Sequence, residues 1–319
     1  MTAKLTALLI GLGGIGCKYD YPPTTDAPFS IAENSKSHLG AILRSGIKLI
    51  GGIDTDENSR EQFEKFTSSP TWNSLENFPK EQVADLVIIS SSTSSHREIF
   101  QDVVNRFKPK GIVVEKPFGS NASDSKCMLE LANNRGIPVR VNYSRNFSQG
   151  FNLIQEVIQN DKLVSGNVFY SQELRRNGSH FIRLVLELFG SPLSVIKQTT
   201  KVQDMNPTFK LIFTNGTAIQ FTGSNSRHVR DGDLSLETEN YLIQIHEGTH
   251  YRISLLNRQA NPVPWPSQLD LLSTGNLNGG LQNIYTNLNW IKQEYYDNQI
   301  EMNFLDNVCN EILDELLSQ

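Results

Sequence analysis

A glycine-rich segment near the start of the chain has the spacing of a phosphate-binding loop. It reads Gly11-Leu12-Gly13-Gly14-Ile15-Gly16 and directly follows an apolar run at 5–10. The first glycine permits a tight turn, the second lets the backbone approach a diphosphate, and the last lets a following helix pack against the strand. Free N–H groups at the start of that helix favour an anion. The segment predicts a dinucleotide-binding loop formed by Gly11, Gly13, Gly14, Ile15 and Gly16.

An acidic residue ends the second apolar run. Asp54 directly follows residues 48–53. Its carboxylate would accept hydrogen bonds from a ribose 2′- and 3′-hydroxyl pair and would repel a 2′-phosphate. We therefore expect NAD as the cofactor, with NADP less favoured. Asp54 lies farther from Gly16 than the usual spacing of about 20 residues, and the proline-containing stretch 19–37 is interpreted as an inserted loop.

Small hydroxyl residues follow the third apolar run, at 86–90. They belong to the segment Ser90-Ser91-Ser92-Thr93-Ser94-Ser95-His96. At the carboxyl edge of a parallel sheet such side chains can contact phosphates and ribose. The same serines can also cap the next helix, and both roles can hold together. The cofactor candidates here are Ser90, Ser91, Ser92 and His96.

A lysine follows the fourth apolar run, at 111–115, in the motif Glu115-Lys116-Pro117. Beside a nicotinamide cation the ammonium form of Lys116 would be disfavoured. Such a lysine can exchange a proton with a substrate hydroxyl while a hydride moves. The alternative is a solvated surface lysine. All three residues are predicted to border the cofactor, with Lys116 as a catalytic candidate.

The elements that must position these residues alternate along the first half of the chain. Five runs are predicted as strands, and helical patterns at 99–107 and from Ser120 or Ser123 to 135 lie between them. Alternating strands and helices indicate βαβ units and a doubly wound parallel sheet. The strand runs are 5–10, 48–53, 86–90, 111–115 and 139–143.

The second half changes character near residue 145. Two hairpins are predicted around Asn215-Gly216 and Gly248, which indicates an antiparallel sheet. The domains are therefore predicted at 1–145, for NAD(P) binding, and 146–319, for substrate binding and oligomerisation. The predicted elements are helices at 151–158, 180–189, 284–296 and 304–317, strands at 209–213, 218–221, 241–246 and 251–256, and a proline-rich loop at 261–266.

Composition excludes several classes of protein. The chain has 319 residues, is 38% hydrophobic and carries a net charge of -5, without a run of Lys and Arg that would follow a phosphate backbone. Its three cysteines are far apart, which fits a reducing cytosol. Apolar runs fall short of the roughly 18 residues of a membrane span. We expect a cytoplasmic protein with no nucleic-acid or membrane partner, and no metal site is predicted.

These motifs, followed by Gly178-Ser179-His180, resemble the glucose–fructose oxidoreductase/inositol dehydrogenase (Gfo/Idh/MocA) family over essentially the whole chain. The resemblance implies a Rossmann domain followed by an α+β domain with an open, mostly antiparallel sheet. It implies NAD(P)-dependent oxidation or reduction of sugars, sugar derivatives or cyclitols, with Lys116 and His180 as catalytic residues. A homodimer or homotetramer through the open sheet is expected. Tyr19, Asp20 and the stretch 142–145 resemble a bacterial branch linked to surface-polysaccharide sugars.

The chain departs from the family next to His180. Many members carry an Asp four residues before this histidine and another three residues after it, where this chain has Arg176 and Arg183. On a helix these residues would share one face with His180 and could bind an anionic substrate such as a sugar acid, a sugar phosphate or a nucleotide sugar. Asn177 and Tyr143 are further substrate candidates.

Three alternatives stay open for this segment and for the reaction. Arg183 can instead pair with Glu187, with Arg176 facing water. The missing carboxylates can mark a catalytically weakened, NAD-binding regulatory protein. Some relatives, finally, use bound NAD transiently for elimination or glycoside cleavage without net redox change.

Overall fold

The chain divides into two compact units. The computed structural model describes residues 4–22, 35–199, 204–225, 232–246, 248–257, 268–292 and 296–318. The first unit comprises 1–144 and 281–307, and the second comprises 145–280 and 308–319. The first division thus falls next to the predicted boundary at 145. Residues 281–307, predicted with the second domain, group with the first unit.

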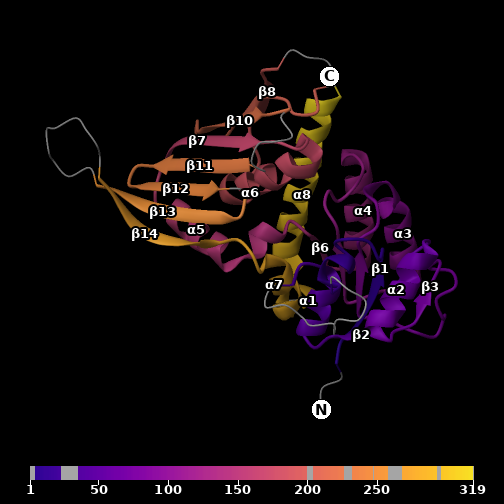
Figure 1. Ribbon diagram of the computed structural model, residues 1–319. Helices are drawn as coiled ribbons and strands as arrows, with labels where there is room; N and C mark the ends of the chain where they lie inside the picture. The colour runs from indigo at the N-terminus through magenta and orange to yellow at the C-terminus, as the bar shows by residue number, and fades with distance from the viewer. Residues whose placement is uncertain are drawn as a thin grey trace, which may run out of the picture. The chain divides into compact units, whose positions relative to one another are not determined.

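The first unit is built on a parallel six-stranded sheet (Figure 1), as the alternating pattern predicts. The strand order is β3-β2-β1-β4-β5-β6, so the order reverses beside β1, where open α/β sheets bind ligands. The strands are β1 (Thr6–Ile10), β2 (Lys48–Ile53), β3 (Thr71–Trp72), β4 (Leu86–Ile89), β5 (Gly111–Val114) and β6 (Val139–Val141). The helices are α1 (His38–Arg44), α2 (Glu57–Thr67), α3 (His96–Arg106) and α4 (Ala122–Arg135).

Local chemistry explains where these elements begin and end. Strands β4 and β5 are buried along their whole length, as apolar strands covered on both faces must be. Helix α4 begins after Asn121, whose side chain accepts from the Asp124 N–H, and ends at Gly136 in the left-handed conformation. The predicted strands and helices of this half are confirmed within a few residues.

The helix expected after Gly16 is interrupted, in line with the inserted loop predicted at 19–37. A single turn ends in the 3-10 segment η1 (Lys18–Asp20), and α1 begins only at His38. The amides of His38 and Leu39 donate to the carbonyls of Ile15 and Gly16, both at 2.9 Å. Helix α1 therefore continues the first turn across the inserted segment, because its free N–H groups meet carbonyls that the interruption left open.

Asp20 fixes the point at which the chain rejoins. Its carboxylate accepts from the amide and the hydroxyl of Ser37, at 2.8 and 2.6 Å. A Cβ on Gly40 would lie 2.2 Å from the same carboxylate, so the glycine permits this close approach. The greater part of the predicted inserted loop, 23–34, lies outside the described residues.

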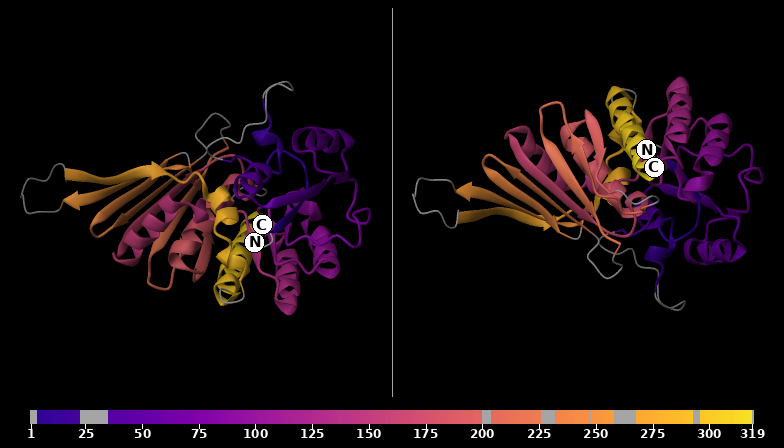
Figure 2. Two further views of the ribbon diagram at one scale, coloured as in Figure 1. Left: turned by 90° about the horizontal axis from the view of Figure 1, so that it is seen from below. Right: turned by 90° about the horizontal axis from the view of Figure 1, so that it is seen from above.

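The second unit contains an eight-stranded sheet in the order β14-β13-β12-β11-β7-β10-β9-β8. All neighbours are antiparallel except β7 and β10, so the predicted mostly antiparallel sheet is confirmed. Helices α5 (Gln149–Gln159) and α6 (Ser179–Phe189) lie on one face of this sheet (Figure 2). The strands are β7 (Leu163–Tyr170), β8 (Ser194–Lys197), β9 (Phe209–Ile212), β10 (Ala218–Gly223), β11 (Gly232–Thr238), β12 (Tyr241–His246), β13 (His250–Asn257) and β14 (Gln268–Asn276).

Sequence analysis found both hairpins, β9–β10 and β12–β13, but missed the strands β7, β8, β11 and β14. Strand β7, at the centre of the sheet, carries Ser165, Gly166 and Asn167, so its apolar alternation is weak. The two hairpins are separated by β7 and β11 and are not neighbours. The position of these polar strands is determined by pairing with strands that are distant in the sequence, and a local sequence pattern does not reveal that pairing.

The C-terminal helices also differ from the prediction. Helix α7 (Gly280–Thr286) begins earlier than expected, the 3-10 segment η5 (Leu288–Ile291) follows, and α8 (Tyr296–Leu317) is one long helix. The proline-rich stretch 261–266 lies outside the described residues. Across the part of the chain that the structure describes, no helix combines the length and the apolar character that crossing a bilayer requires.

Candidate functional site

A hollow of about 620 Å³ lies in the first unit where the carboxyl ends of β1, β2 and β4 meet. This is the edge at which ligands bind in open α/β sheets, beside the reversal of strand order. The hollow is lined by Ile10, Gly11, Gly13, Ile53, Asp54, Thr55, Asn73, Ser74, Leu75, Glu76, Ser90, Ser91, Ser92, Ser95, Glu98, Ile99 and Asp102.

The glycines at this hollow have different structural roles. Gly11 has φ +94°, and a Cβ there would lie 2.5 Å from the Ser90 backbone. A Cβ on Gly16 would lie 2.2 Å from the Gly11 carbonyl oxygen, so both glycines are required by close backbone packing. Gly13 differs, since nothing lies within 4 Å of the Cβ position and its open side borders the hollow. The residues present therefore fit a dinucleotide, whose diphosphate would rest against Gly13.

Asp54 joins the end of β2 to the glycine loop. Its Oδ2 accepts from the Leu12 N–H at 2.7 Å, and its Oδ1 accepts from the Asp56 N–H at 2.9 Å. Each carboxylate oxygen keeps a lone pair for a further donor. Asp54 is half-buried and lines the hollow, as a residue that receives ribose hydroxyls must.

The serine-rich segment forms the wall beside β4. The Ser90 hydroxyl donates to the Gly11 carbonyl at 2.8 Å, which ties this wall to the glycine loop. His96 is fully buried, with Nδ1 3.1 Å from the Phe118 carbonyl oxygen and Nε2 3.2 Å from that of Ser91. Burial lowers its pKa despite these carbonyls. Both ring nitrogens are used inside the protein, so His96 fits a positioning role and not the predicted direct cofactor contact.

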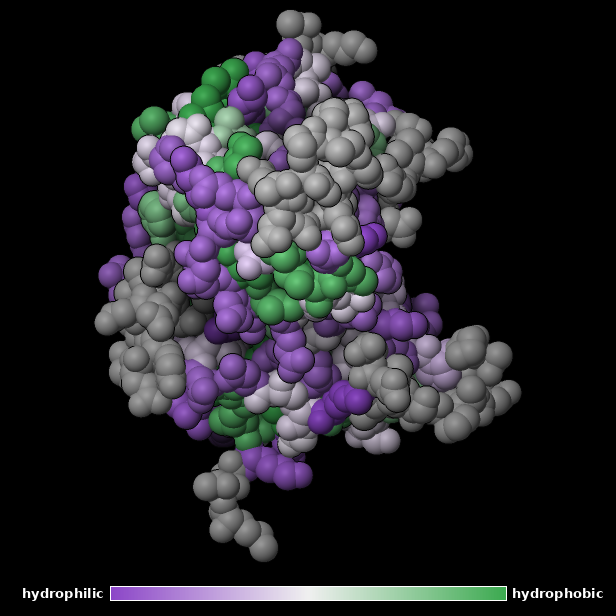
Figure 3. Space-filling model, turned by 90° about the vertical axis from the view of Figure 1, so that its left-hand side faces the viewer, coloured by the Kyte–Doolittle hydropathy of each residue, from purple (hydrophilic) through white to green (hydrophobic). Residues whose placement is uncertain are grey.

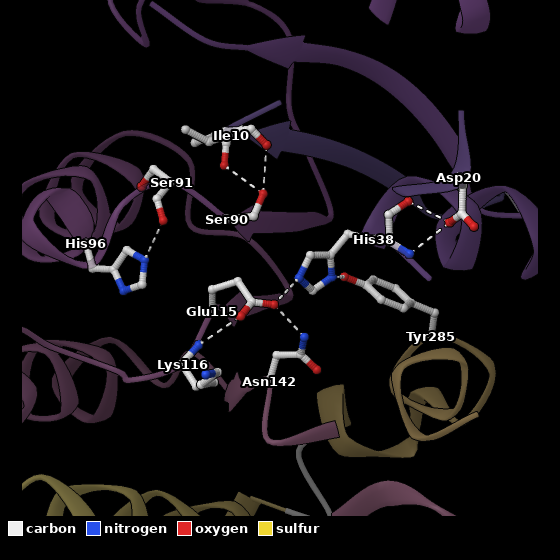
Figure 4. A network of polar contacts seen from close by, with 12 residues as sticks. Ile10, Asp20, His38, Ser90, Ser91, His96, Glu115, Lys116, Asn142 and Tyr285 are labelled. Atoms are coloured by element: carbon white, nitrogen blue, oxygen red, sulfur yellow. Dashed lines mark hydrogen bonds and ion pairs between the residues drawn. The ribbon is translucent and has the colours of Figure 1, made fainter. Parts of the chain in front are cut away.

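Glu115 anchors a buried polar network at the end of β5 (Figure 4). Its Oε1 accepts from Nε2 of His38 at 2.9 Å and from Nδ2 of Asn142, and its Oε2 accepts from the Lys116 N–H at 3.2 Å. Nδ1 of His38 lies against the hydroxyl of Tyr285. Three segments that are separate in the sequence, at His38, Asn142 and Tyr285, thus meet behind the Glu115-Lys116 pair.

This network keeps the Glu115 carboxylate ionised. Burial alone raises the pKa of Glu115, but the hydrogen bond and charge of His38, the Asn142 amide and the charge of Lys116 outweigh it and hold the pKa below its ordinary value. The pKa of Tyr285 is raised far above its usual range by burial and by the nearby Glu115 charge. Burial and the Glu115 charge therefore both favour the protonated phenol.

The two predicted catalytic residues lie in different units. Lys116 is half-buried, precedes a cis peptide bond to Pro117, and lies just after β5 in the first unit. His180 is half-buried in the first turn of α6 in the second unit. Of the described residues, no group of three or more His, Cys, Asp and Glu side chains is placed to hold a metal ion.

The prediction that Arg176, His180 and Arg183 share one helix face is wrong. Arg176 lies in the π-helical turn η4 (Leu174–Gly178), which winds more loosely than the α-helix that follows. Arg176 is exposed, whereas the Arg183 side chain is 2% exposed and forms an ion pair with Glu187. The alternative in which Arg183 pairs with Glu187 and Arg176 is exposed is the arrangement found.

The other substrate candidates are also buried. Tyr143 is almost fully buried in the first unit, and Asn177 donates to the Ser171 carbonyl at 3.3 Å in the second. Arg176 borders a hollow of about 670 Å³. Its lining residues are Gln172, Glu173, Arg176, Met205, Asn206, Ser224 and Asn225.

Sequence reasoning missed His38 and Tyr285, and it singled out Asn142 only as part of a family-like stretch. His38 follows the inserted segment, and Tyr285 lies 247 residues away from it in the chain. A buried carboxylate in Glu115-Lys116-Pro117 requires donors, which is a signal that partners exist. It does not say which residues they are.

Comparison with known proteins agrees with this geometry. Residues 5–143 match the model of the Gfo/Idh/MocA family, described as an oxidoreductase family with an NAD-binding Rossmann fold. This match confirms, for residues 5–143, the resemblance to the family that the motifs predict. No curated protein matches the chain.

Solved structures extend the likeness of fold to the second unit. A dehydrogenase from Chromobacterium violaceum is 14% identical with a TM-score of 0.75, covering 99% of this chain and 95% of that one. The WlbA dehydrogenase from Bordetella pertussis, in complex with NADH and UDP-GlcNAcA, is 17% identical with a TM-score of 0.62 over 76% and 78%. A super-repressor mutant of Gal80p from Saccharomyces cerevisiae is 11% identical with a TM-score of 0.71 over 99% and 97%.

Proposed function

We propose that the protein transfers a hydride between NAD and a sugar-like hydroxyl or ketone, with Lys116 as the proton carrier. The observation that carries the proposal is the place of Lys116. It lies just after β5, at the carboxyl edge of the same parallel sheet whose glycine loop borders the hollow, and a buried network holds the neighbouring Glu115.

Bound NAD supplies the hydride acceptor or donor, and the chain supplies the rest. Lys116 takes the proton from the substrate hydroxyl in oxidation and returns it in reduction. His180 is the proposed partner that contacts the reacting hydroxyl, since an imidazole exchanges protons near neutral pH. The glycine loop binds, and Asp54 orients, the non-reacting part of the cofactor.

The charges at the hollow favour NAD over NADP in this proposal. Four acidic residues, Asp54, Glu76, Glu98 and Asp102, line it, and the described lining residues include no Lys or Arg. The nearby Arg60 donates to the carbonyls of Asp54 and Thr55, at 2.8 and 2.9 Å. A 2′-phosphate would therefore meet carboxylates without a guanidinium turned toward it.

Replacement of Lys116 tests the proposal most simply. Lys116→Ala is expected to reduce turnover by roughly 10²–10⁴-fold, the usual contribution of a general acid or base, while NAD still binds. Lys110→Ala is the matched control, because Lys110 lies at the other end of β5, where its exposed side chain pairs with Asp85. Turnover by Lys116→Ala within a few-fold of the wild type would remove Lys116 from the reaction. NADH absorbance with a panel of ketosugars and sugar acids provides the assay.

A second candidate function is an NAD-binding regulatory protein. The arginines in place of the family carboxylates favour it, and a Gal80p structure shares the fold. Binding of NAD without turnover on any sugar, sugar acid or nucleotide sugar would support this reading. NAD that stays bound through purification, together with product formation and no net NADH, would instead support non-redox elimination or glycoside cleavage.

The substrate class and the assembly complete the proposal. A sugar of bacterial surface polysaccharides, processed in the cytoplasm, is the proposed substrate, and the hollow bordered by Arg176 suits an anionic group on it. A homodimer or homotetramer through the open sheet is proposed because Leu271 and Leu272 on the edge strand β14 are exposed. Figure 3 shows a hydrophobic patch within a mostly hydrophilic face.

A further inference from the structure

His38 occupies a position that connects the two parts of the dinucleotide site. It is the first residue of α1, fully buried, and its amide donates to the Ile15 carbonyl of the glycine loop at 2.9 Å. Its ring reaches the Glu115 carboxylate, which directly precedes Lys116. One residue thus contacts the glycine loop through its backbone and the end of β5 through its ring, and Figure 4 shows the ring contact.

The donor and acceptor roles of the two ring nitrogens of His38 follow from their partners. An ionised carboxylate only accepts, so the nitrogen facing Glu115, Nε2, carries a hydrogen and donates at 2.9 Å. The hydroxyl of Tyr285 stays protonated and faces Nδ1, to which it donates when the ring is neutral. Tyr285 therefore orients the ring, and the ring in turn donates to Glu115.

Glu115 depends on these donors because it is removed from water. A buried carboxylate remains ionised only when hydrogen bonds or opposite charges replace its hydration. The groups that face Glu115 are the His38 imidazole from α1, the Asn142 amide after β6, the Tyr285 phenol from α7, the His96 imidazole from α3 and the adjoining Lys116. Of these, His38 makes the largest favourable contribution.

We propose that His38 is a positioning residue for Lys116: by donating to Glu115 it keeps that buried carboxylate ionised, and the carboxylate favours the protonated form of the Lys116 amine. This role concerns the same site as the proposed function. It rests on that function only for the claim that Lys116 exchanges a proton with the substrate. Without the His38 donor, Glu115 becomes protonated over a wider pH range, and the Lys116 ammonium loses its negative neighbour.

The test measures the ionisation of Lys116 directly and needs no substrate. Lysines of the full-length protein are reductively methylated with ¹³C-formaldehyde, and the dimethylamine resonance of Lys116 is identified by its loss in Lys116→Arg. Its NMR titration is then followed in each variant. In His38→Leu the pKa of Lys116 is expected to fall by about one unit, the lower end of the effect of an adjacent opposite charge. Glu115→Gln is expected to cause a similar fall.

Two matched variants separate this role from simple packing. His38→Gln keeps an N–H donor toward Glu115 and is expected to restore a pKa for Lys116 close to that of the wild type. Tyr285→Phe removes only the hydroxyl that orients the ring and leaves Nε2 as a donor, so it is expected to lower the pKa of Lys116 by less than His38→Leu. Glu115→Gln and His38→Gln decide the question if His38→Leu does not fold.

Two results would overturn the role proposed for His38. An unchanged Lys116 titration in Glu115→Gln overturns the proposal, as does a shift in His38→Gln as large as that in His38→Leu. A protein inactive on every substrate still yields these values, so the proposed reaction can fail while the role of His38 stands. The reverse also holds, because Lys116→Ala tests turnover without reference to His38.

Discussion

The carboxyl edge of the first sheet and the segment that leads into α6 place polar residues in opposite ways. At the first edge, parallel strands end side by side, so Asp54, Ser90 and Glu115 come together although they are far apart in sequence. Before α6, neighbours in sequence diverge, and Arg176 is exposed whereas Arg183 is buried. Strand order is thus a more reliable guide to a site than helical spacing when the helix begins irregularly.

The cause of this divergence lies in the backbone before α6. Gln172 and Glu173 both have positive φ, at 60° and 72°, which is uncommon for residues with a Cβ. The Asn206 side chain accepts from the Glu173 N–H at 2.9 Å and holds this turn. The π-helical turn η4 follows, so the periodicity that applies within α6 does not extend back to Arg176.

The largest expected effect compares the two arginines. Arg183→Leu is expected to lower the free energy of unfolding by about 3 kcal/mol, because it leaves the Glu187 carboxylate, itself 19% exposed, without its partner. Arg176→Leu, at an exposed position, is expected to change it by about 0.5 kcal/mol or less. Urea unfolding measures both. Equal effects would mean that the two side chains do not differ in environment, and the comparison would fail.

A glycine pair tests the edge of the first sheet. Gly11→Ala is expected to lower the free energy of unfolding by roughly 2–3 kcal/mol, because φ is +94° and the new Cβ would lie 2.5 Å from the Ser90 backbone. Gly136→Ala is the control, with φ +63° in open space, and should cost about 1 kcal/mol. Thermal or urea unfolding of both variants gives the difference. A loss for Gly11→Ala no larger than that of the control would argue against close packing of the loop on β4.

The smallest expected effect is a pH dependence from Glu115. Its folded-state pKa is lowered, so its contribution to stability is fully present above the unfolded value of about 4.3 and is lost as pH falls through the folded pKa. Glu115→Gln should therefore flatten the acid side of the stability profile relative to the wild type. Unfolding free energies measured from pH 7 down to acid unfolding check this. A steeper acid limb in the variant would contradict the lowered pKa.

The sequence predicts the residues at strand ends better than the residues that tertiary packing brings to them. The glycine loop, Asp54 and Glu115-Lys116-Pro117 are contiguous motifs at strand ends, and strand ends meet by a general rule of parallel sheets. His38 and Tyr285 reach Glu115 only because the inserted segment and the C-terminal segment 281–307 pack in the first unit. Their partners are set by tertiary packing, which local patterns do not encode.

The second unit shows the same limit in its sheet. The hairpin β9–β10 was readable because Gly216 takes a positive φ of 80° in a tight turn. The polar central strand β7 and the edge strand β14 were not, because their neighbours determine their burial. Helical spacing offered both a shared face for Arg176 and Arg183 and the Arg183–Glu187 pair, and it did not decide between them.

The most direct test of dinucleotide binding at the glycine loop is calorimetry with Gly13→Ala. Nothing lies within 4 Å of the added Cβ, so this variant should fold with the stability of the wild type. The methyl group would nevertheless occupy the side of the loop that a diphosphate approaches. We predict that the wild type binds NAD more tightly than NADP and that Gly13→Ala binds NAD at least about tenfold more weakly, a difference of roughly 1.4 kcal/mol. Equal NAD binding by the two proteins, or no binding of either nucleotide to the folded wild type, would contradict the account.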